Sequence, residues 1–438
     1  MSQPATTVSW FNRAWRNDYL VVLATDAVLG ALGLVSSVLV ARSVGRDGRG
    51  VLAAVLLWVG VVGAVGTIGL PHALTFYSGR NPASRGFLWR LALRLALLHG
   101  LVFGATAAVV VPLIVAEQGA QAAAAARWFA VSVPINLLVA VQLALIQGSG
   151  AFRLWSALRA FQAVSYVLIL AACWSTAGLT VERALIAQLA AVSMVGCLAT
   201  LFSRPKFRAA LDPPPQPMPR ALYIYGLPTL LATVCAMSST QLDQLVLTVS
   251  VPEGQLGLYA VAVSLSLALL PIASAVGSVA ITHMARADGG KEQSATARKS
   301  VGGVFLVLAV FGIAGAILAE WLVVFLYGES FRDAAPALRI LALAAPFLGA
   351  GQVAASVLRG GGRPYLAAMG EILGALLTVG LLALLLPRMG ILGAAVASLA
   401  AYATTFLTQV ASIVRGLGIP LRSLLTLFAA PRPQTPSP

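Results

Sequence analysis

Long apolar runs alternate with short polar stretches along almost the whole chain. Each run is close to the ~20 residues that a helix needs to cross the ~30 Å hydrocarbon core of a bilayer. In lipid, helices satisfy all their backbone groups internally. The pattern therefore predicts an all-α integral membrane protein with about 12 transmembrane helices. The predicted spans are Tyr19–Val40, Leu52–Phe76, Leu88–Val115, Trp128–Ile146, Leu154–Trp174, Ala184–Phe202, Leu222–Val249, Leu256–Thr282, Val301–Leu326, Ala337–Leu358, Tyr365–Leu386 and Leu392–Val414.

The composition agrees with this pattern. Of the 438 residues, 59% are hydrophobic and 10% are charged, and the mean hydropathy is +0.90. A soluble domain carries about 25% charged residues, which it needs to cover its surface in water. With so few charges, most of the surface of this protein must face lipid.

The formal net charge of +15 is explained by the position of the basic residues. Most Lys and Arg fall in alternate loops, on the side that holds both ends of the chain, which is the asymmetry of the positive-inside rule. We therefore expect cytoplasmic N- and C-termini and a location in a bacterial plasma membrane. Membrane lipids are expected partners, through attraction to anionic headgroups, and nucleic acid is not.

One strong compositional break, SRPKFRAALDPPPQPMPR from Ser203 to Arg220, interrupts the apolar pattern between the sixth and seventh spans. A Pro-rich run behaves as a semi-stiff extended spacer rather than as a helix. The predicted organisation is a six-helix bundle over residues 1–202, a cytoplasmic linker over 203–220, a second six-helix bundle over 221–416 and a cytoplasmic tail over 417–438.

The two halves also resemble each other. VGRDGRGVLAA from Val44 matches VPEGQLGLYAV from Val251, at an offset of 207 positions, and QGSGAFRLW from Gln147 matches RGGGRPYLA from Arg359, at an offset of 212. Because each half has six spans, both enter the membrane from the same side, and the predicted duplication is a parallel repeat. Transporters built on repeats place the substrate path at the repeat interface.

Among the ionisable side chains inside predicted spans, the functional candidates are Asp26, Arg94, Arg159, Asp243 and Glu371. Such groups are costly in lipid and usually face a cavity, so each is a functional candidate. Asp26 and Asp243 are candidates for coupling or gating, and the other three for the substrate cavity. Asp243 lies deepest in apolar sequence, whereas Arg94 is close enough to the inner face to snorkel to the headgroups. Asp26 and Glu371 also come near the interface if the span boundaries shift by one turn.

Arg159 and Glu371 occupy equivalent positions in the two halves under the offset of 212. We hypothesise that they face each other across a cleft between the bundles. Six prolines, which bend or break helices, lie within or at the ends of spans, at Pro71, Pro112, Pro134, Pro228, Pro271 and Pro346.

Catalytic and metal-binding patterns are absent from the sequence. The three cysteines and three histidines are scattered and lack the spacing of metal ligands. The Gly-rich loops GRDGRG and GGGR have neither the strand–helix setting nor the Lys-Ser/Thr of a phosphate-binding loop. We therefore expect no catalytic residue, no metal and no cofactor.

Several segments, in the same order along most of the chain, resemble the polysaccharide flippases of the multidrug/oligosaccharidyl-lipid/polysaccharide exporter superfamily. They are VARSVGRDGRGVLA from Val40, IGLPHALTFYSGR from Ile68, QGSGAFRLWSALR from Gln147, QLDQLVLTVSVPEGQLGLYAVAVSL from Gln241, LRGGGRPYLAAMGEIL from Leu358 and MGILGAAVASLAAY from Met389.

The resemblance implies two six-helix bundles around a central cavity and alternating access without ATP hydrolysis by the chain. It implies a polyprenyl-pyrophosphate-linked glycan as substrate, carried from the inner to the outer leaflet for surface polysaccharide biosynthesis. Arg94 and Arg159 would then meet the pyrophosphate, because charge-assisted bonds are strong where the dielectric is low. A polysaccharide polymerase and glycosyltransferases are the implied partners. Lipid II flippases of this superfamily commonly have fourteen spans, so twelve favours the oligosaccharide branch.

Three other functions stay open from the sequence. A cation-coupled exporter of amphipathic drugs with the same fold would need net acid in its cavity. A membrane-embedded sugar polymerase or ligase would need a catalytic constellation, and here every predicted outer loop is short. A non-transporting scaffold for a biosynthetic complex is the third.

Overall fold

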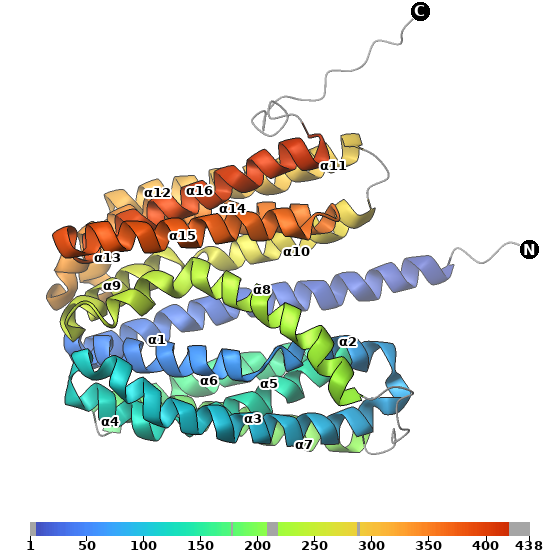
Figure 1. Ribbon diagram of the computed structural model, residues 1–438, viewed down its shortest axis with the longest axis horizontal. Coiled ribbons are helices and arrows are strands. Elements are labelled where there is room, and N and C mark those ends of the chain that lie inside the picture. The colour runs from blue at the N-terminus through green and yellow to red at the C-terminus, as the bar shows by residue number, and fades with distance from the viewer. Residues whose placement is uncertain (1–5, 177, 208–217, 287–289, 420–438) are drawn as a thin grey trace, which may run out of the picture. The chain divides into compact units, whose positions relative to one another are not determined.

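The computed structural model describes residues 6–176, 178–207, 218–286 and 290–419, and every regular element within these ranges is a helix (Figure 1). Each predicted span consists mainly of helical residues, which confirms the all-α prediction. The α-helices are α1 (Thr6–Gly66), α2 (Leu70–Arg80), α3 (Arg85–Ile114), α4 (Gly119–Phe129), α5 (Ser132–Gly148), α6 (Phe152–Thr176), α7 (Val181–Phe207), α8 (Met218–Leu247), α9 (Glu253–Ser266), α10 (Leu270–Arg286), α11 (Gly290–Ala297), α12 (Gly303–Ile317), α13 (Ala319–Tyr327), α14 (Ala335–Gly360), α15 (Pro364–Met389) and α16 (Ile391–Leu417).

Eight stretches of the described residues are long and apolar enough to cross a membrane, or nine if the bent pair α9–α10 is one span. Two of these stretches, of 46 and 48 residues, are about twice as long as a single crossing needs. The first covers most of α1, where Gly45 interrupts the helix with a positive φ of 71°. The first two predicted spans are therefore joined through a kinked helix rather than through an open loop.

The second span of each half is broken at the same kind of site. α2 begins at Leu70 and α10 begins at Leu270, and each of these leucines is followed by a proline, Pro71 or Pro271. Proline has no N–H, so it is tolerated in the first turn of a helix but interrupts a helix that precedes it. The α9–α10 pair bends by 47° at this break. The shared Leu-Pro break supports the predicted repeat.

The other prolines behave differently. Pro134 follows a third break, between α4 and α5. The remaining three are accommodated within continuous helices, Pro112 in α3, Pro228 in α8 and Pro346 in α14. Neighbouring helices in a membrane protein re-satisfy the backbone groups that an internal proline frees.

The described helices pack into two compact units. Unit 1 contains residues 1–237, 244–264 and 323–333, and unit 2 contains residues 238–243, 265–322 and 334–438. Three stretches that belong to the second half of the sequence, residues 221–237, 244–264 and 323–333, therefore pack with the first half. The predicted division at the Pro-rich linker stays a prediction, because residues 208–217 of the linker and residues 420–438 of the tail lie outside the described residues.

Close helix packing in each unit depends on small residues. In unit 1, a Cβ on Gly100 of α3 would lie 2.6 Å from the Cα of Pro134 in α5. In unit 2, a Cβ on Gly374 of α15 would lie 2.0 Å from the Oγ1 of Thr405 in α16. Lipid is as apolar as a leucine side chain, so membrane helices associate through such close backbone approach rather than through the hydrophobic effect.

Candidate substrate and coupling sites

Asp26 and Arg159 form an ion pair inside unit 1, with 2.9 Å between the guanidinium Nη1 and the carboxylate Oδ1. α1 supplies Asp26 and α6 supplies Arg159, each within a stretch that is apolar enough to cross the membrane. Trp155 lies one turn before Arg159, and its ring centroid is 4.5 Å from the guanidinium carbon. The arginine is thus held between a carboxylate and an aromatic face.

The pair is accessible from outside the unit. The side chain of Arg159 is 28% exposed and that of Asp26 is 30% exposed. A guanidinium has five N–H donors in a planar fork, more than one carboxylate oxygen can occupy. The Arg159 guanidinium therefore has a fixed orientation and N–H groups that can bind a ligand. Asp26 balances the charge of the guanidinium when no ligand is bound.

The other two predicted cavity residues have different surroundings. Arg94 is exposed on α3 and shares its face with the exposed side chains of Leu97, Leu98 and Leu101. This surface has the composition of a lipid-facing one, which favours snorkelling of Arg94 to the headgroups. Glu371 is half-buried on α15 of unit 2, where Arg359 is the charge that acts on it. The pairing of Arg159 with Glu371 stays a prediction.

Asp243 is buried in unit 2, with 3% of its surface exposed. The hydroxyl of Ser398 in α16 donates a hydrogen bond of 2.7 Å to its Oδ2. Tyr402, one turn further along α16, interacts with the Asp243 carboxylate and with Ser398. A carboxyl group buried among hydroxyls in an apolar bundle can hold a proton or a small cation, which is the chemistry of a coupling site.

We expect Asp243→Asn to fold like the wild type, because the amide keeps the shape and still accepts the bond from Ser398. It cannot gain or lose a proton, so transport by this variant should lose its dependence on an imposed pH or sodium gradient. The measurement is uptake by proteoliposomes with and without each gradient, with Ser398→Ala as the matched variant that keeps the carboxyl group. If transport by Asp243→Asn depends on the gradients as much as transport by the wild type does, Asp243 has no role in coupling and contributes to packing only.

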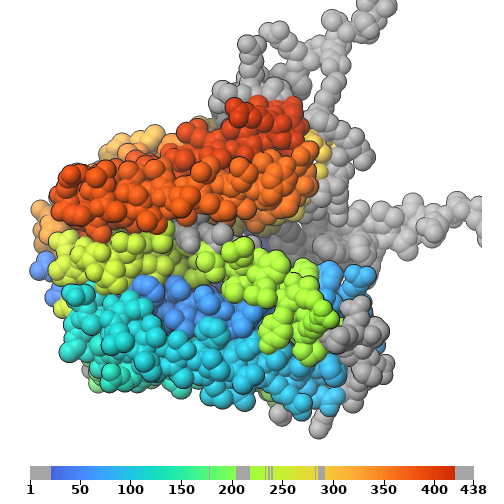
Figure 2. Space-filling view, viewed as in Figure 1, coloured from blue at the N-terminus to red at the C-terminus, as the bar shows by residue number. Residues whose placement is uncertain are grey.

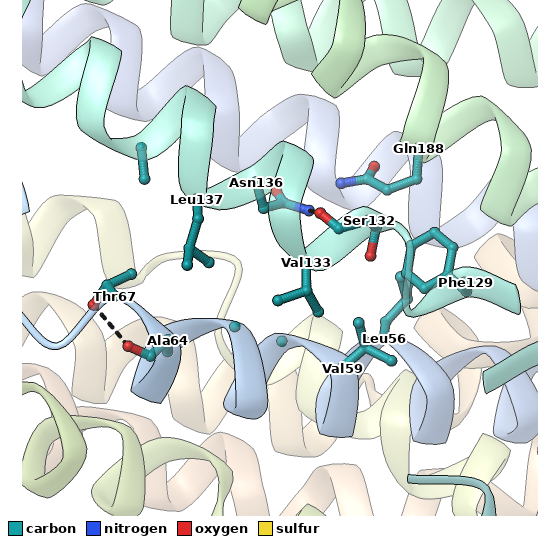
Figure 3. A pocket seen from close by; sticks show the side chains of 13 residues that line it. Leu56, Val59, Ala64, Thr67, Phe129, Ser132, Val133, Asn136, Leu137 and Gln188 are labelled. Carbon is teal, nitrogen blue, oxygen red and sulfur yellow. Dashed lines mark hydrogen bonds between the residues drawn. The ribbon is translucent and has the colours of Figure 1, made fainter. Parts of the chain in front are cut away.

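A cavity of 290 Å³ lies within unit 1, between the second half of α1 and helices α4, α5 and α7 (Figure 3). Its polar lining consists of uncharged groups: Thr67, Ser132, Asn136 and Gln188. Ser132 is 1% exposed, and its Oγ has no hydrogen-bond partner among the described residues. Hydroxyls and amides of this kind suit a neutral polar ligand or water rather than an ion.

The predicted first outer loops of the two halves meet in unit 1, at a contact that we call the glycine seam, formed by residues 46–50 and 253–257. A Cβ on Gly50 would lie 1.8 Å from the carbonyl oxygen of Glu253, and a Cβ on Gly257 would lie 1.9 Å from that of Arg46. The offset of 207 relates Gly50 to Gly257 and Arg46 to Glu253, so the contact is reciprocal. Only glycine allows the two backbones to approach so closely.

Polar bonds reinforce the seam on both sides. The Nε2 of Gln118 donates to the carbonyl oxygens of Thr248, at 2.9 Å, and Val251, at 2.6 Å. Arg49 donates from Nη2 to the hydroxyl of Ser264 at 3.3 Å. Arg42 donates to the last carbonyls of α13, at 2.7 Å to Leu326, where the negative end of a helix dipole favours a cation.

Sequence reasoning missed three of these features. Trp155 carried a usable signal, because residues four apart share a helix face and Trp155 is four before Arg159. The seam also had a signal, since the 207-residue offset pointed to these two loops. The cavity had none: Asn136 and Gln188 are ordinary polar residues in apolar spans until the packing of α5 on α7 brings them together.

The long apolar helices and the ionisable groups within them define a multi-span membrane protein. The structure is similar over 93% of the chain, and 92% of the other chain, to the lipid II flippase MurJ in an inward closed conformation, with a TM-score of 0.69 and 16% identity. It is similar, with a TM-score of 0.67, 16% identity and coverage of 91% and 99%, to a multidrug resistance MATE family transporter of the MOP superfamily in an inward-facing conformation. It is also similar to a MOP superfamily transporter from Pyrococcus furiosus, with a TM-score of 0.64, 15% identity and coverage of 92% of this chain and 96% of the other.

The chain belongs to the polysaccharide biosynthesis protein family, whose sequence profile matches residues 18–336. No curated protein sequence gives a significant match. The predicted family, the all-α fold with about 12 spans in two repeats, and a membrane role in polysaccharide biosynthesis are thereby confirmed.

Proposed function

We propose that this protein is a flippase that moves a polyprenyl-pyrophosphate-linked oligosaccharide from the inner to the outer leaflet of a bacterial plasma membrane. Family membership supports a role in polysaccharide biosynthesis, and the similar solved structures are transporters or flippases rather than enzymes. The glycan would come from glycosyltransferases on the cytoplasmic side and pass to a polysaccharide polymerase on the other. The basic loops favour cytoplasmic termini.

The ion pair between Asp26 and Arg159 carries this proposal. A pyrophosphate has several anionic oxygens, and two of them can accept the two parallel N–H bonds that a guanidinium fork donates. On binding, it would displace Asp26 as the partner of Arg159, while Trp155 keeps the guanidinium in place. Because Asp26 competes for the same donors, the site holds the substrate without trapping it, which a transporter requires.

The proposed activity can be tested with the purified full-length chain in proteoliposomes. The probe is a polyprenyl-pyrophosphate-linked saccharide placed in one leaflet, and the readout is its exposure to a membrane-impermeant glycosidase added outside. We expect that the protein makes the saccharide accessible to the glycosidase, and that the saccharide is still joined to the lipid until the glycosidase is added. Exposure no faster than in empty liposomes would contradict transport, and release of free saccharide before the glycosidase is added would indicate catalysis.

A cation-coupled exporter of amphipathic drugs is the second candidate. Buried Asp243 favours it, since a carboxyl group sealed in an apolar bundle suits cation coupling, and the TM-score of 0.67 to the MATE family transporter is close to that for the flippase. This candidate predicts that expression in a drug-sensitive host raises tolerance to cationic dyes. The flippase predicts no such change, and predicts that deletion causes lipid-linked saccharide to accumulate in the inner leaflet.

A further inference from the structure

An aromatic cluster stands on the surface of unit 1, where α2 meets the beginning of α8. The rings of Phe76 and Tyr225 are stacked, with centroids 4.8 Å apart and planes 15° from parallel. Tyr77 approaches Phe76 edge-on at 5.1 Å, and the guanidinium carbon of Arg80 lies 5.9 Å from the centroid of Phe76. Phe76 and Tyr225 cover each other's facing surfaces, and Arg80 lies over the Phe76 ring, so the platform of this cluster is the outer ring face of Tyr225, backed by Phe76.

The backbone holds the platform rigidly. Gly69, at the break before α2, has a positive φ of 69°, and a Cβ there would lie 2.0 Å from the carbonyl oxygen of Gly226. This contact presses α2 against α8 beside Tyr225. Figure 2 shows the beginning of α8 lying at the surface beside α3, to which Tyr223 is tied by a 2.9 Å bond with His99.

The platform remains open to a ligand. Phe76 is 39% exposed and Tyr225 is 36% exposed. His72 and Arg80 are exposed on the same face of α2 as Phe76, at helical spacings of four residues. Other exposed positions nearby on α8 are instead aliphatic, such as Leu227 and Leu231. The face therefore combines flat rings with side chains that donate hydrogen bonds.

We propose that Tyr225, backed by Phe76 and flanked by Tyr77, offers its outer face as a stacking platform for a sugar ring of the transported glycan. Arg80 and His72 at the edge of the cluster would bond the hydroxyl or acidic groups of the glycan. The C–H groups of a pyranose carry partial positive charge and pack on the negative face of an aromatic ring. Equatorial hydroxyls then point outward, toward donors at the platform edge. The inference rests on the proposed flippase function and adds to it the part of the site that recognises the glycan rather than the pyrophosphate.

Two probes separate these roles in binding assays with the purified full-length protein. One is a bare polyprenyl pyrophosphate, and the other is the same lipid carrying a saccharide. The test variant is the pair Phe76→Leu and Tyr225→Leu, which keeps the apolar volume and removes the ring faces. The matched control is Trp128→Leu, because Trp128 is a similarly exposed aromatic residue of unit 1, 37% exposed and packed edge-on against Phe129.

We expect the double variant to bind the saccharide probe up to about tenfold more weakly, the upper range for the loss of one aromatic stacking contact, and to bind the bare lipid like the wild type. Tyr225→Phe should retain most of the affinity. If the affinities for both probes fall equally, or if neither falls, the proposed sugar platform is wrong. An equal fall would mean that the rings anchor the protein at the membrane interface. If the wild type binds neither probe, the proposed function itself fails.

Discussion

Replacing Arg159 with glutamine is expected to reduce transport of a lipid-linked saccharide by at least about tenfold, equivalent to about 1.4 kcal/mol. Glutamine can donate from one amide only and carries no charge, so it cannot bind a pyrophosphate through a charged fork. Arg159→Lys should give an intermediate rate, because it keeps the charge but loses the fork and the stack on Trp155. The measurement is the initial rate of saccharide exposure in proteoliposomes, normalised to folded protein.

Two further variants separate a role in transport from a role in folding. Arg94→Gln is the matched control, since Arg94 is also an arginine inside a predicted span but is exposed beside aliphatic residues, and its transport rate should stay near that of the wild type. The exchange of charges by Asp26→Arg with Arg159→Asp should restore the yield of folded protein that either reversal lowers. Its transport should remain low, because the arginine would stand on α1, away from Trp155. Wild-type transport by the exchanged protein would show that the pair is structural only.

Alanine in place of Gly50 or Gly257 is expected to destabilise unit 1 by about 1–3 kcal/mol each, the range for overpacking a close contact. Each new Cβ would lie less than 2 Å from a carbonyl oxygen, at 1.8 Å and 1.9 Å respectively, so the backbones must move apart. Because one separation makes room for both methyl groups, the double variant should be less destabilised than the sum of the single variants. Thermal unfolding of the purified chain in detergent measures all three.

Gly33→Ala provides the control for the seam. Gly33 lies on the same helix, α1, and a Cβ there would meet nothing within 4 Å. Alanine is a better helix former than glycine by about 1 kcal/mol, so this variant should be unchanged or slightly more stable. Strictly additive losses at Gly50 and Gly257 would contradict the reciprocal contact, since they would mean that the two glycines sit in independent environments.

The spans and their number could be predicted from the sequence because lipid imposes a local requirement. Each crossing needs its own run of apolar residues, and each helix satisfies its own backbone groups, whatever its neighbours do. The breaks were only partly predictable. Pro71 and Pro271 break their spans, while Pro112 and Pro346 do not, and the difference depends on whether adjacent helices satisfy the freed backbone groups.

The candidate sites depended more on packing. The list of intramembrane charges came from the sequence, but their partners did not: Asp26 and Arg159 are 133 positions apart, and only the packing of α1 on α6 joins them. The repeat offset identified equivalent residues such as Arg159 and Glu371, although equivalence does not imply contact. Gly50 and Gly257 are equivalent and do lie at one contact.

The sequence by itself determined that the protein lies in lipid, the class of its fold, its expected orientation and its family. Each of these follows from local hydrophobicity, from charge in the loops or from short motifs read in order. Tertiary structure decided which charges are paired, which are exposed and where glycine is indispensable. These properties depend on helices that are distant in sequence coming within a few ångströms of each other, and no local pattern encodes that approach.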